Sequence, residues 1–187
     1  MGGSMRFINS SIDGVFVAES DRHADARGTF SRLFCADELS GVIGSRRIAQ
    51  VNMSHTRTAG TVRGMHCQRP PDAEMKLVTC LKGRVWDVAV DLRAGSKTFM
   101  RWHAEELSPA NRRIMIIPEG CAHGFQSLEA ESELLYLHTA YYNPASEIGV
   151  QPSDPLLAIS WPLQIADLSE RDQTHPLLSA NFHGLPT

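Results

Sequence analysis

The sequence predicts one β-rich domain of the sandwich or barrel class, from three observations. The length of 187 residues is typical of a single domain. The composition, 42% hydrophobic and 21% charged, is that of an ordinary globular chain and excludes disorder, coiled coil and collagen. Between Ile48 and Thr139, short β-favouring runs alternate with turn residues, and helical periodicity is almost absent. We assign residues 5–187 to this domain and interpret Met1–Ser4, ahead of a second methionine, as a remnant of cloning.

Seven runs are predicted strands, because β-favouring residues recur in them between turn residues. They are Ile48–Met53, Thr61–Gln68, Met75–Lys82, Arg84–Leu92, Thr98–Leu107, Arg113–Pro118 and Glu133–Ala140. In Arg84–Leu92, apolar side chains occupy one face and Asp87 and Asp91 the other, which is the pattern of a half-buried strand. Lys82-Gly83 predicts a tight hairpin turn, so the strands on either side are expected to pair antiparallel.

Other regular structure is expected to be short. Helices are predicted at Ala36–Ser40 and at Leu168–Asp172, where Ser169 can cap the first turn. Four prolines between Asn143 and Leu163 indicate a connection that wraps the surface.

The charge pattern excludes several classes of partner. The net charge is -3, and Lys and Arg are scattered, whereas a duplex-binding surface needs them clustered. No apolar run approaches the roughly 20 residues that span a bilayer, and the N-terminal residues lack the apolar core of an export signal. We therefore expect a cytoplasmic protein that binds neither nucleic acid nor a membrane.

Two segments combine a histidine with glycines: Arg63–Gln68 around His66, and Ile117–Phe125 around His123. Glycine lets a ligand or a backbone approach closely, although a lone histidine in a strand is more often structural. Lys76 lies in an apolar strand, where burying its charge is costly unless a partner or a ligand compensates it. It either belongs to a binding site or protects an edge strand from aggregation.

Nine motifs follow one another in an order that is far more specific than any one of them. They are Asp25-Ala-Arg27-Gly28, Gln50-Val-Asn52-Met-Ser54, Val62-Arg63-Gly64-Met-His66-Cys-Gln68, Lys76-Leu-Val78, the run from Gly83 to Arg93, Ser96-Lys-Thr98-Phe99, the run from Ile117 to Phe125, Tyr141-Tyr142, and the run from Leu168 to Asp172. Together they resemble the dTDP-4-dehydrorhamnose 3,5-epimerase family, and the resemblance extends over most of Val15–Leu178. The resemblance implies a cupin-type jelly-roll β-barrel with short N-terminal and C-terminal helices. It also implies a homodimer, a nucleotide-linked 4-keto-6-deoxyhexose as substrate, and no metal or other cofactor.

The resemblance implies four catalytic residues. His66 is the base that removes the proton beside the sugar ketone, and Asp172 orients and polarises its imidazole. Tyr136 is the acid that returns a proton to the opposite face, as inversion requires, and Lys76 stabilises the enolate at the C4 oxygen. These roles suit the residue types, because imidazole titrates near neutral pH and a fixed positive charge counts most in a dry site.

Six further residues are implied to bind the substrate. They are Gln50, Asn52, Arg63 and His123 around the sugar and diphosphate, Arg27 near the nucleotide from its own or the partner subunit, and Tyr142 stacked on the base. Arginine suits a diphosphate because its planar fork donates two parallel hydrogen bonds. Strict alternation places Arg63 and His66 on opposite faces of one strand, so both reach one cavity only if the strand bulges or twists at Gly64.

Three departures from the family pattern bear on the substrate. His23 stands where an aromatic residue beside the base is common, and Arg32 replaces a glutamate. Leu137-His138 follow Tyr136, where the family usually has a lysine directly after the tyrosine. These changes affect base recognition and the cavity wall more than proton abstraction. They leave open whether C3, C5 or both are inverted, and which nucleotide is bound.

Two other classes of function remain open. A metal-dependent cupin enzyme holds its metal through a His-x-His pair, a glutamate and a later histidine. Here the first pair is His66-Cys67-Gln68, so the ligands would have to be Glu74 with His66 and His123. A sugar-binding module would keep the cavity without the chemistry, but it has no need of both a base and an acid.

Overall fold

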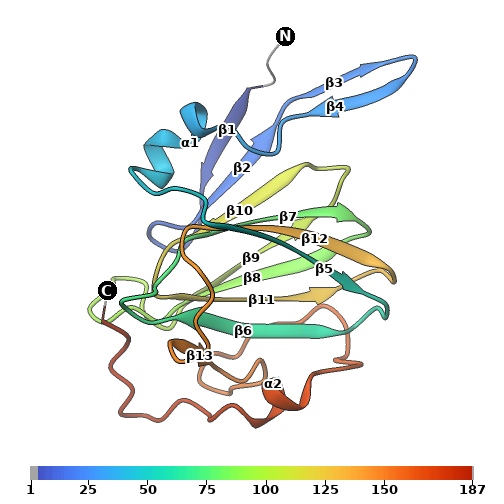
Figure 1. Cartoon of the computed structure of the whole chain (residues 1–187). Helices are drawn as coiled ribbons and strands as arrows, with labels where there is room; N and C mark the ends of the chain where they lie inside the picture. The colour runs from blue at the N-terminus through green and yellow to red at the C-terminus, as the bar shows by residue number, and fades with distance from the viewer. Residues whose placement is uncertain (1–3, 187) are drawn as a thin grey trace.

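The computed structural model describes residues 4–186, in which the chain forms two β-sheets that face each other (Figure 1). The six-stranded sheet contains, in spatial order, β1 (Met5–Asn9), β2 (Phe16–Ser20), β10 (Arg113–Ile117), β7 (Lys76–Lys82), β12 (Ser132–His138) and β5 (Gln50–Thr56). The five-stranded sheet contains β13 (Glu147–Gly149), β6 (Val62–Gln68), β11 (Cys121–Ser127), β8 (Val85–Asp91) and β9 (Trp102–Leu107). This all-β jelly-roll barrel confirms the predicted fold. Of the segment interpreted as a cloning remnant, Met1–Gly3 lie outside the described residues.

Four smaller elements decorate the barrel. β3 (Arg22–Asp25) and β4 (Gly28–Ser31) form a hairpin that projects from the body of the molecule (Figure 1). α1 (Ala36–Ile43) begins where predicted and runs three residues further. α2 (Glu170–Thr174) follows Ser169, whose Oγ accepts a hydrogen bond from the Asp172 N–H at 3.1 Å and provides the predicted cap. Within residues 4–186, no helix is long and apolar enough to cross a membrane.

The central strands of each sheet are covered on both faces. Between the sheets, Val78 and Leu134 of the six-stranded sheet belong to one apolar cluster with Ala89 and Phe125 of the five-stranded sheet. α1 covers the outer face of the six-stranded sheet with its buried Leu39. The C-terminal segment covers the outer face of the five-stranded sheet. Strands buried in this way carry few of the alternating polar positions that mark an exposed face.

β8 is buried on both faces, so the prediction of a half-buried strand is wrong. Asp87 and Asp91 are 0% exposed. The C-terminal segment covers the face that carries Val88 and Val90, and the face of the two aspartates lies inside the barrel. Buried carboxylates need hydrogen-bond partners, and Asp87 has His123. The polar face of the strand is therefore an interior wall.

The predicted hairpin between β7 and β8 is also wrong. Gly83 turns the chain with a φ of 75°, but β7 pairs with β10 and β12, whereas β8 pairs with β9 and β11. The turn passes the chain from one sheet to the other. Because β7 is a central strand, Lys76 does not protect a sheet edge, and the alternative of a protective edge lysine is excluded.

The predicted irregularity at Gly64 is confirmed. His66 lies opposite His123, and Arg63 lies opposite Phe125, so three steps along β6 match two steps along β11. This β-bulge brings Arg63 and His66 to the same cavity.

We expect Gly64→Ala to lower the free energy of unfolding by about 3 kcal/mol in urea denaturation. Gly64 has a φ of 118°, and a Cβ atom built on it would lie 2.5 Å from the Gly124 Cα. Gly41→Ala is the matched control, because Gly41 lies in α1 with nothing within 4 Å of the added atom. That change should raise stability by about 0.5–1 kcal/mol. Equal effects of the two substitutions would contradict the packing described for the bulge.

Candidate active site

A cavity of about 690 Å³ opens between the two sheets, which is the size of a small-molecule site. Its walls come from β5, β6, β7, β11 and β12, and from the chain around α2. Seven of the residues proposed from the sequence line it: Asn52, Arg63, His66, Lys76, His123, Tyr136 and Asp172.

Strand register explains why these side chains converge. On the interior face of the six-stranded sheet, His138 lies opposite Lys76, and Tyr136 lies opposite Asn52. On the five-stranded sheet, His123 lies opposite His66. Residues paired across neighbouring strands share a face, so two rows of polar side chains point into the cavity from opposite walls.

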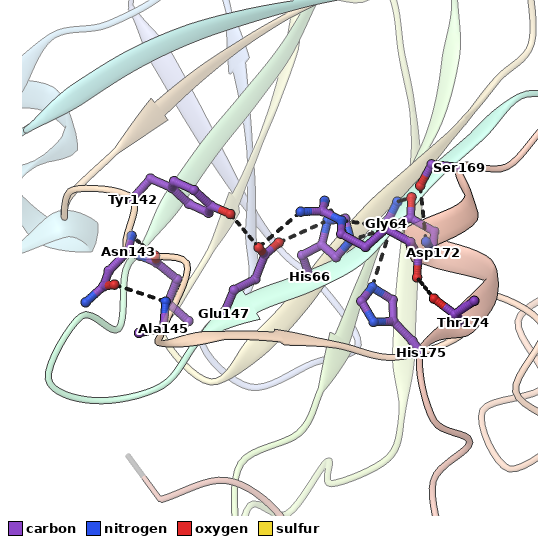
Figure 2. Close-up of polar contacts among 12 residues, drawn as sticks. Gly64, His66, Tyr142, Asn143, Ala145, Glu147, Ser169, Asp172, Thr174 and His175 are labelled. Carbon is purple, nitrogen blue, oxygen red and sulfur yellow. Dashed lines mark hydrogen bonds and ion pairs between the residues drawn. The ribbon is translucent and has the colours of Figure 1, made fainter.

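His66 forms a hydrogen-bonded dyad with Asp172 (Figure 2). The ring Nε2 lies 2.6 Å from Asp172 Oδ1, and the Gly64 N–H donates to Asp172 Oδ2 at 3.2 Å. Burial tends to raise the pKa of Asp172, but these hydrogen bonds and the charge of His66 outweigh it and lower the pKa to about 2. Asp172 is thus an ionised acceptor that fixes the imidazole and stabilises its protonated form.

The low pKa of Asp172 predicts a pH-dependent contribution to stability. The unfolded carboxyl titrates near 3.8 and the folded one near 2, so the stabilisation is present above about pH 4 and is lost as the pH falls toward 2. In urea denaturation at pH 6, we expect Asp172→Asn to be less stable than the wild type by about 2 kcal/mol. At pH 2 the difference should vanish. A difference that is the same at both pH values would show that the charge of Asp172 is not the cause.

Tyr136 and His123 lie deeper in the barrel, with their rings 6.1 Å apart and edge to face. The Tyr136 hydroxyl shares a hydrogen bond of 2.8 Å with Ser54 Oγ, and burial raises its pKa, so the hydroxyl keeps its proton at neutral pH. His123 Nε2 lies 2.7 Å from Asp87 Oδ1, and burial raises the pKa of Asp87 although His123 opposes the shift.

Lys76 places its ammonium beside His66. The Lys76 Nζ donates to the His66 carbonyl oxygen at 3.2 Å and pairs with Glu74 Oε1 at 3.3 Å. The lysine is 9% exposed and lines the cavity, so its charge acts in a largely dry site. A cationic donor, a histidine with a carboxylate partner and a protonated phenol are the groups needed to move a proton beside a carbonyl.

The comparisons with known proteins agree with this site. The profile of the family described as dTDP-4-dehydrorhamnose 3,5-epimerase matches residues 9–180. The chain belongs to this family. It is 42% identical to a dTDP-4-dehydrorhamnose 3-epimerase of Streptomyces niveus, over 94% of this chain and 84% of the relative. It is 40% identical to a dTDP-4-dehydrorhamnose 3,5-epimerase of Salmonella typhimurium, over 93% of this chain and 96% of the relative.

A crystal structure shows the same likeness. The dTDP-6-deoxy-D-glucose-3,5-epimerase of Legionella pneumophila, in complex with dTDP-4-keto-L-rhamnose, superposes with a TM-score of 0.89 at 40% identity over 97% of each chain. The protein is therefore an isomerase of the epimerase type.

Three of the proposed binding residues do not line the cavity of their own chain. Arg27 lies on the projecting hairpin with a side chain that is 90% exposed, and it pairs with Asp25 at 2.6 Å. Gln50 Oε1 accepts a hydrogen bond from the Tyr142 N–H at 3.2 Å. Tyr142 is half-exposed, and its hydroxyl donates to Glu147 Oε2 at 2.7 Å.

Sequence reasoning missed three residues around the dyad of this epimerase. Figure 2 shows a line of contacts that runs from Tyr142 through Glu147 toward His66. Glu147 Oε1 lies 3.9 Å from His66 Nδ1, and Arg171 joins Glu147 to His66. His175 packs edge to face against His66, 5.4 Å between centroids. Arg171 lies inside the family motif from Leu168 to Asp172, so the sequence offered a signal for it. Glu147 lies in the proline-rich segment, which carries no signal for a strand.

The three departures from the family pattern lie partly on or beside the projecting hairpin and partly in the cavity. His23 lies beside Arg27 on the exposed hairpin, and Arg32 pairs with Glu38 of α1. His138 lines the cavity and lies 2.8 Å from Glu74. Only the third departure therefore reaches the wall of this chain's own site.

The ligand set of a metal-dependent cupin does not gather in residues 4–186. Glu74 is held by Lys76 and His138, and His123 is held by Asp87. Among residues 4–186, one group of histidines and carboxylates has the spacing of a metal site, and it consists of His66, Asp172 and His175. The Arg171 guanidinium, 3.3 Å from His66 Nε2, places a positive charge beside it, which opposes a second cation.

Proposed function

We propose that this epimerase inverts a dTDP-linked 4-keto-6-deoxyhexose at C3, C5 or both, the two carbons next to the C4 ketone, with His66 as base and Tyr136 as acid. One observation carries the proposal. His66 stands on β6 of the five-stranded sheet and Tyr136 stands on β12 of the six-stranded sheet, so the two groups face one cavity from opposite walls. Inversion needs this arrangement, because a base that returned its own proton would restore the starting configuration.

The chemistry follows from the groups on each wall. His66 takes the proton from the carbon beside the ketone and becomes an imidazolium that Asp172 stabilises. The electron pair moves to the C4 oxygen, where the Lys76 ammonium stabilises the enolate. The Tyr136 hydroxyl gives its proton to the opposite face of that carbon. Solvent then takes the proton of His66 and returns one to Tyr136, so no net proton is gained or lost.

The product of the reaction tests this proposal. The protein is incubated with dTDP-4-keto-6-deoxyglucose, and the configuration at C3 and C5 is determined by NMR. We expect inversion at C3, which is named for both curated relatives, and the same spectrum determines whether C5 is inverted. A chelator should not change the rate. Stoichiometric bound metal with activity lost to the chelator would favour the metal-dependent cupin instead.

We further propose a homodimer in which the β3–β4 hairpin of each subunit reaches the cavity of the other. Arg27 does not line the cavity of its own chain, its side chain is 90% exposed, and Phe30 on the same hairpin is 63% exposed. Val51 and Met53 are 57% and 63% exposed on β5, the edge strand of the six-stranded sheet. Exposed apolar groups at a sheet edge are typical of a protein interface. We also propose a cytoplasmic location. The four cysteines are free thiols, as is usual for proteins of the reducing cytosol.

Mixed dimers test the shared site. Arg27→Ala and His66→Ala are each expected to be weakly active or inactive alone. If Arg27 acts in the partner's cavity, a mixed dimer contains one intact site, and an equal mixture recovers about a quarter of the wild-type activity. If Arg27 acts in its own subunit, every mixed site lacks one of the two groups and no activity returns. Light scattering on the same samples checks that dimers form.

A further inference from the structure

A buried histidine–carboxylate pair beside the cavity has no part in the proposed mechanism. His138 Nδ1 lies 2.8 Å from Glu74 Oε2, and the side chains are 13% and 7% exposed. His138 also stacks with Tyr136 at 6.1 Å between centroids, and its Nε2 lies 3.4 Å from Asn52 Nδ2. Burying a histidine and a carboxylate costs desolvation free energy that their hydrogen bond need not recover. Stability alone therefore does not explain this pair.

Glu74 links His138 to Lys76. Its two carboxylate oxygens are divided between them, with Oε1 at 3.3 Å from Lys76 Nζ and Oε2 at 2.8 Å from His138 Nδ1. Burial tends to raise the pKa of Glu74, but the hydrogen bond with His138 and the charge of Lys76 outweigh burial and lower it. Glu74 is thus an ionised bridge, and His138 Nδ1 is its N–H donor.

This bridge determines how Lys76 presents its charge. An ammonium has three N–H groups, and among the described residues two of them have acceptors, Glu74 Oε1 and the His66 carbonyl. The third is left for an oxygen in the cavity. Without the His138 donor on Oε2, the buried Glu74 carboxylate would have only the Lys76 ammonium as a partner. Both carboxylate oxygens would then compete for the N–H groups of Lys76.

We propose that His138 is a positioning residue that acts through Glu74 to keep one N–H group of Lys76 directed at the substrate's C4 oxygen. The inference rests on the proposed function and concerns only how Lys76 is held. Its effect belongs to the step in which negative charge develops on oxygen, so it lowers the barrier and contributes little to substrate binding.

Two substitutions of His138 separate a role through Glu74 from a direct contact with the substrate. His138→Asn keeps an N–H donor at the place of Nδ1, and His138→Gln carries its donor at the place of Nε2. We expect His138→Asn to keep kcat within about threefold of wild type. His138→Gln should lose about 10–100-fold in kcat with KM within about threefold. Glu74→Gln should resemble His138→Gln, and the double variant should lose no more than either single variant.

The pH profile gives a second readout that a packing defect alone would not change. The charged or titratable groups facing Glu74 are Lys76 on β7, His138 on β12 and Cys67 on β6. Loss of the Nδ1 donor raises the pKa of Glu74, so the acid limb of kcat moves to higher pH in His138→Gln but not in His138→Asn. The matched control is His55→Gln, because His55 pairs with Glu131 at the same 2.8 Å on the exposed surface, and it should leave both kcat and the profile unchanged.

Each outcome separates this inference from the proposed function. Turnover in the wild type with equal kcat for His138→Asn and His138→Gln overturns the positioning role alone. A larger loss in His138→Asn than in His138→Gln shows that Nε2 acts directly in the cavity, which also overturns it. Failure of the wild type to turn over any nucleotide-linked 4-keto sugar overturns the proposed function, and the role of His138 in that reaction falls with it.

Discussion

His66→Ala is expected to abolish proton exchange at the sugar carbons, a loss of about 10³-fold or more. The variant removes the imidazole that takes the proton, and alanine has no group that can accept one. Asp172, whose low pKa keeps it a weak base, is left paired with His175 and Arg171. The measurement is the rate at which solvent deuterium enters dTDP-4-keto-6-deoxyglucose.

Two controls accompany His66→Ala. His103→Ala removes a half-buried histidine that pairs with Glu105 at 3.0 Å outside the cavity, and it should keep wild-type activity. Asp172→Asn should lose about 100-fold, because the base remains but its protonated form is no longer stabilised by a charge. Exchange in His66→Ala at the wild-type rate would show that another group removes the proton.

Tyr136→Phe is expected to separate exchange from inversion. The enolate still forms at His66, but the opposite wall has no proton to give, so the proton returns to the face it left. We expect deuterium exchange within about tenfold of wild type, and inversion slower by about 100-fold or more. NMR measures both in one sample, as loss of the carbon-bound proton signal and as appearance of the epimer.

Ser54→Ala is the matched control for Tyr136→Phe. It removes the hydrogen-bond partner of the tyrosine and keeps the phenol, so inversion should fall by less than about tenfold. Inversion at the wild-type rate in Tyr136→Phe would reassign the acid, and His123, whose ring lies edge to face with Tyr136, would be the next group to test.

The sequence predicted the members of the cavity better than the pairing of the strands around it. The family resemblance implied His66, Lys76, Tyr136 and Asp172. They come from β6, β7, β12 and α2, and each lies in a run that β-favouring composition or a capping serine had identified. Pairing was harder, because the turn at Gly83 looks the same whether its strands join one sheet or pass between two. Only the whole set of long-range contacts decides between them.

The other errors have separate physical causes. Asp87 and Asp91 look like solvent-facing residues in the sequence, but the second sheet covers their face. β13 was missed because three residues in a proline-rich segment carry no periodicity, and with it Glu147 was missed. The position of Arg27 outside its own cavity could not be inferred from one chain's sequence, because it depends on how the hairpin projects.

His66 is the group that we propose removes a proton beside the ketone of a nucleotide-linked sugar. The most direct test is to incubate the protein with dTDP-4-keto-6-deoxyglucose in deuterated water and to follow C3 and C5 by NMR. We expect deuterium at one or both carbons with the wild type and at neither with His66→Ala. Absence of exchange at both carbons with the wild type, with no other nucleotide sugar accepted, would contradict it.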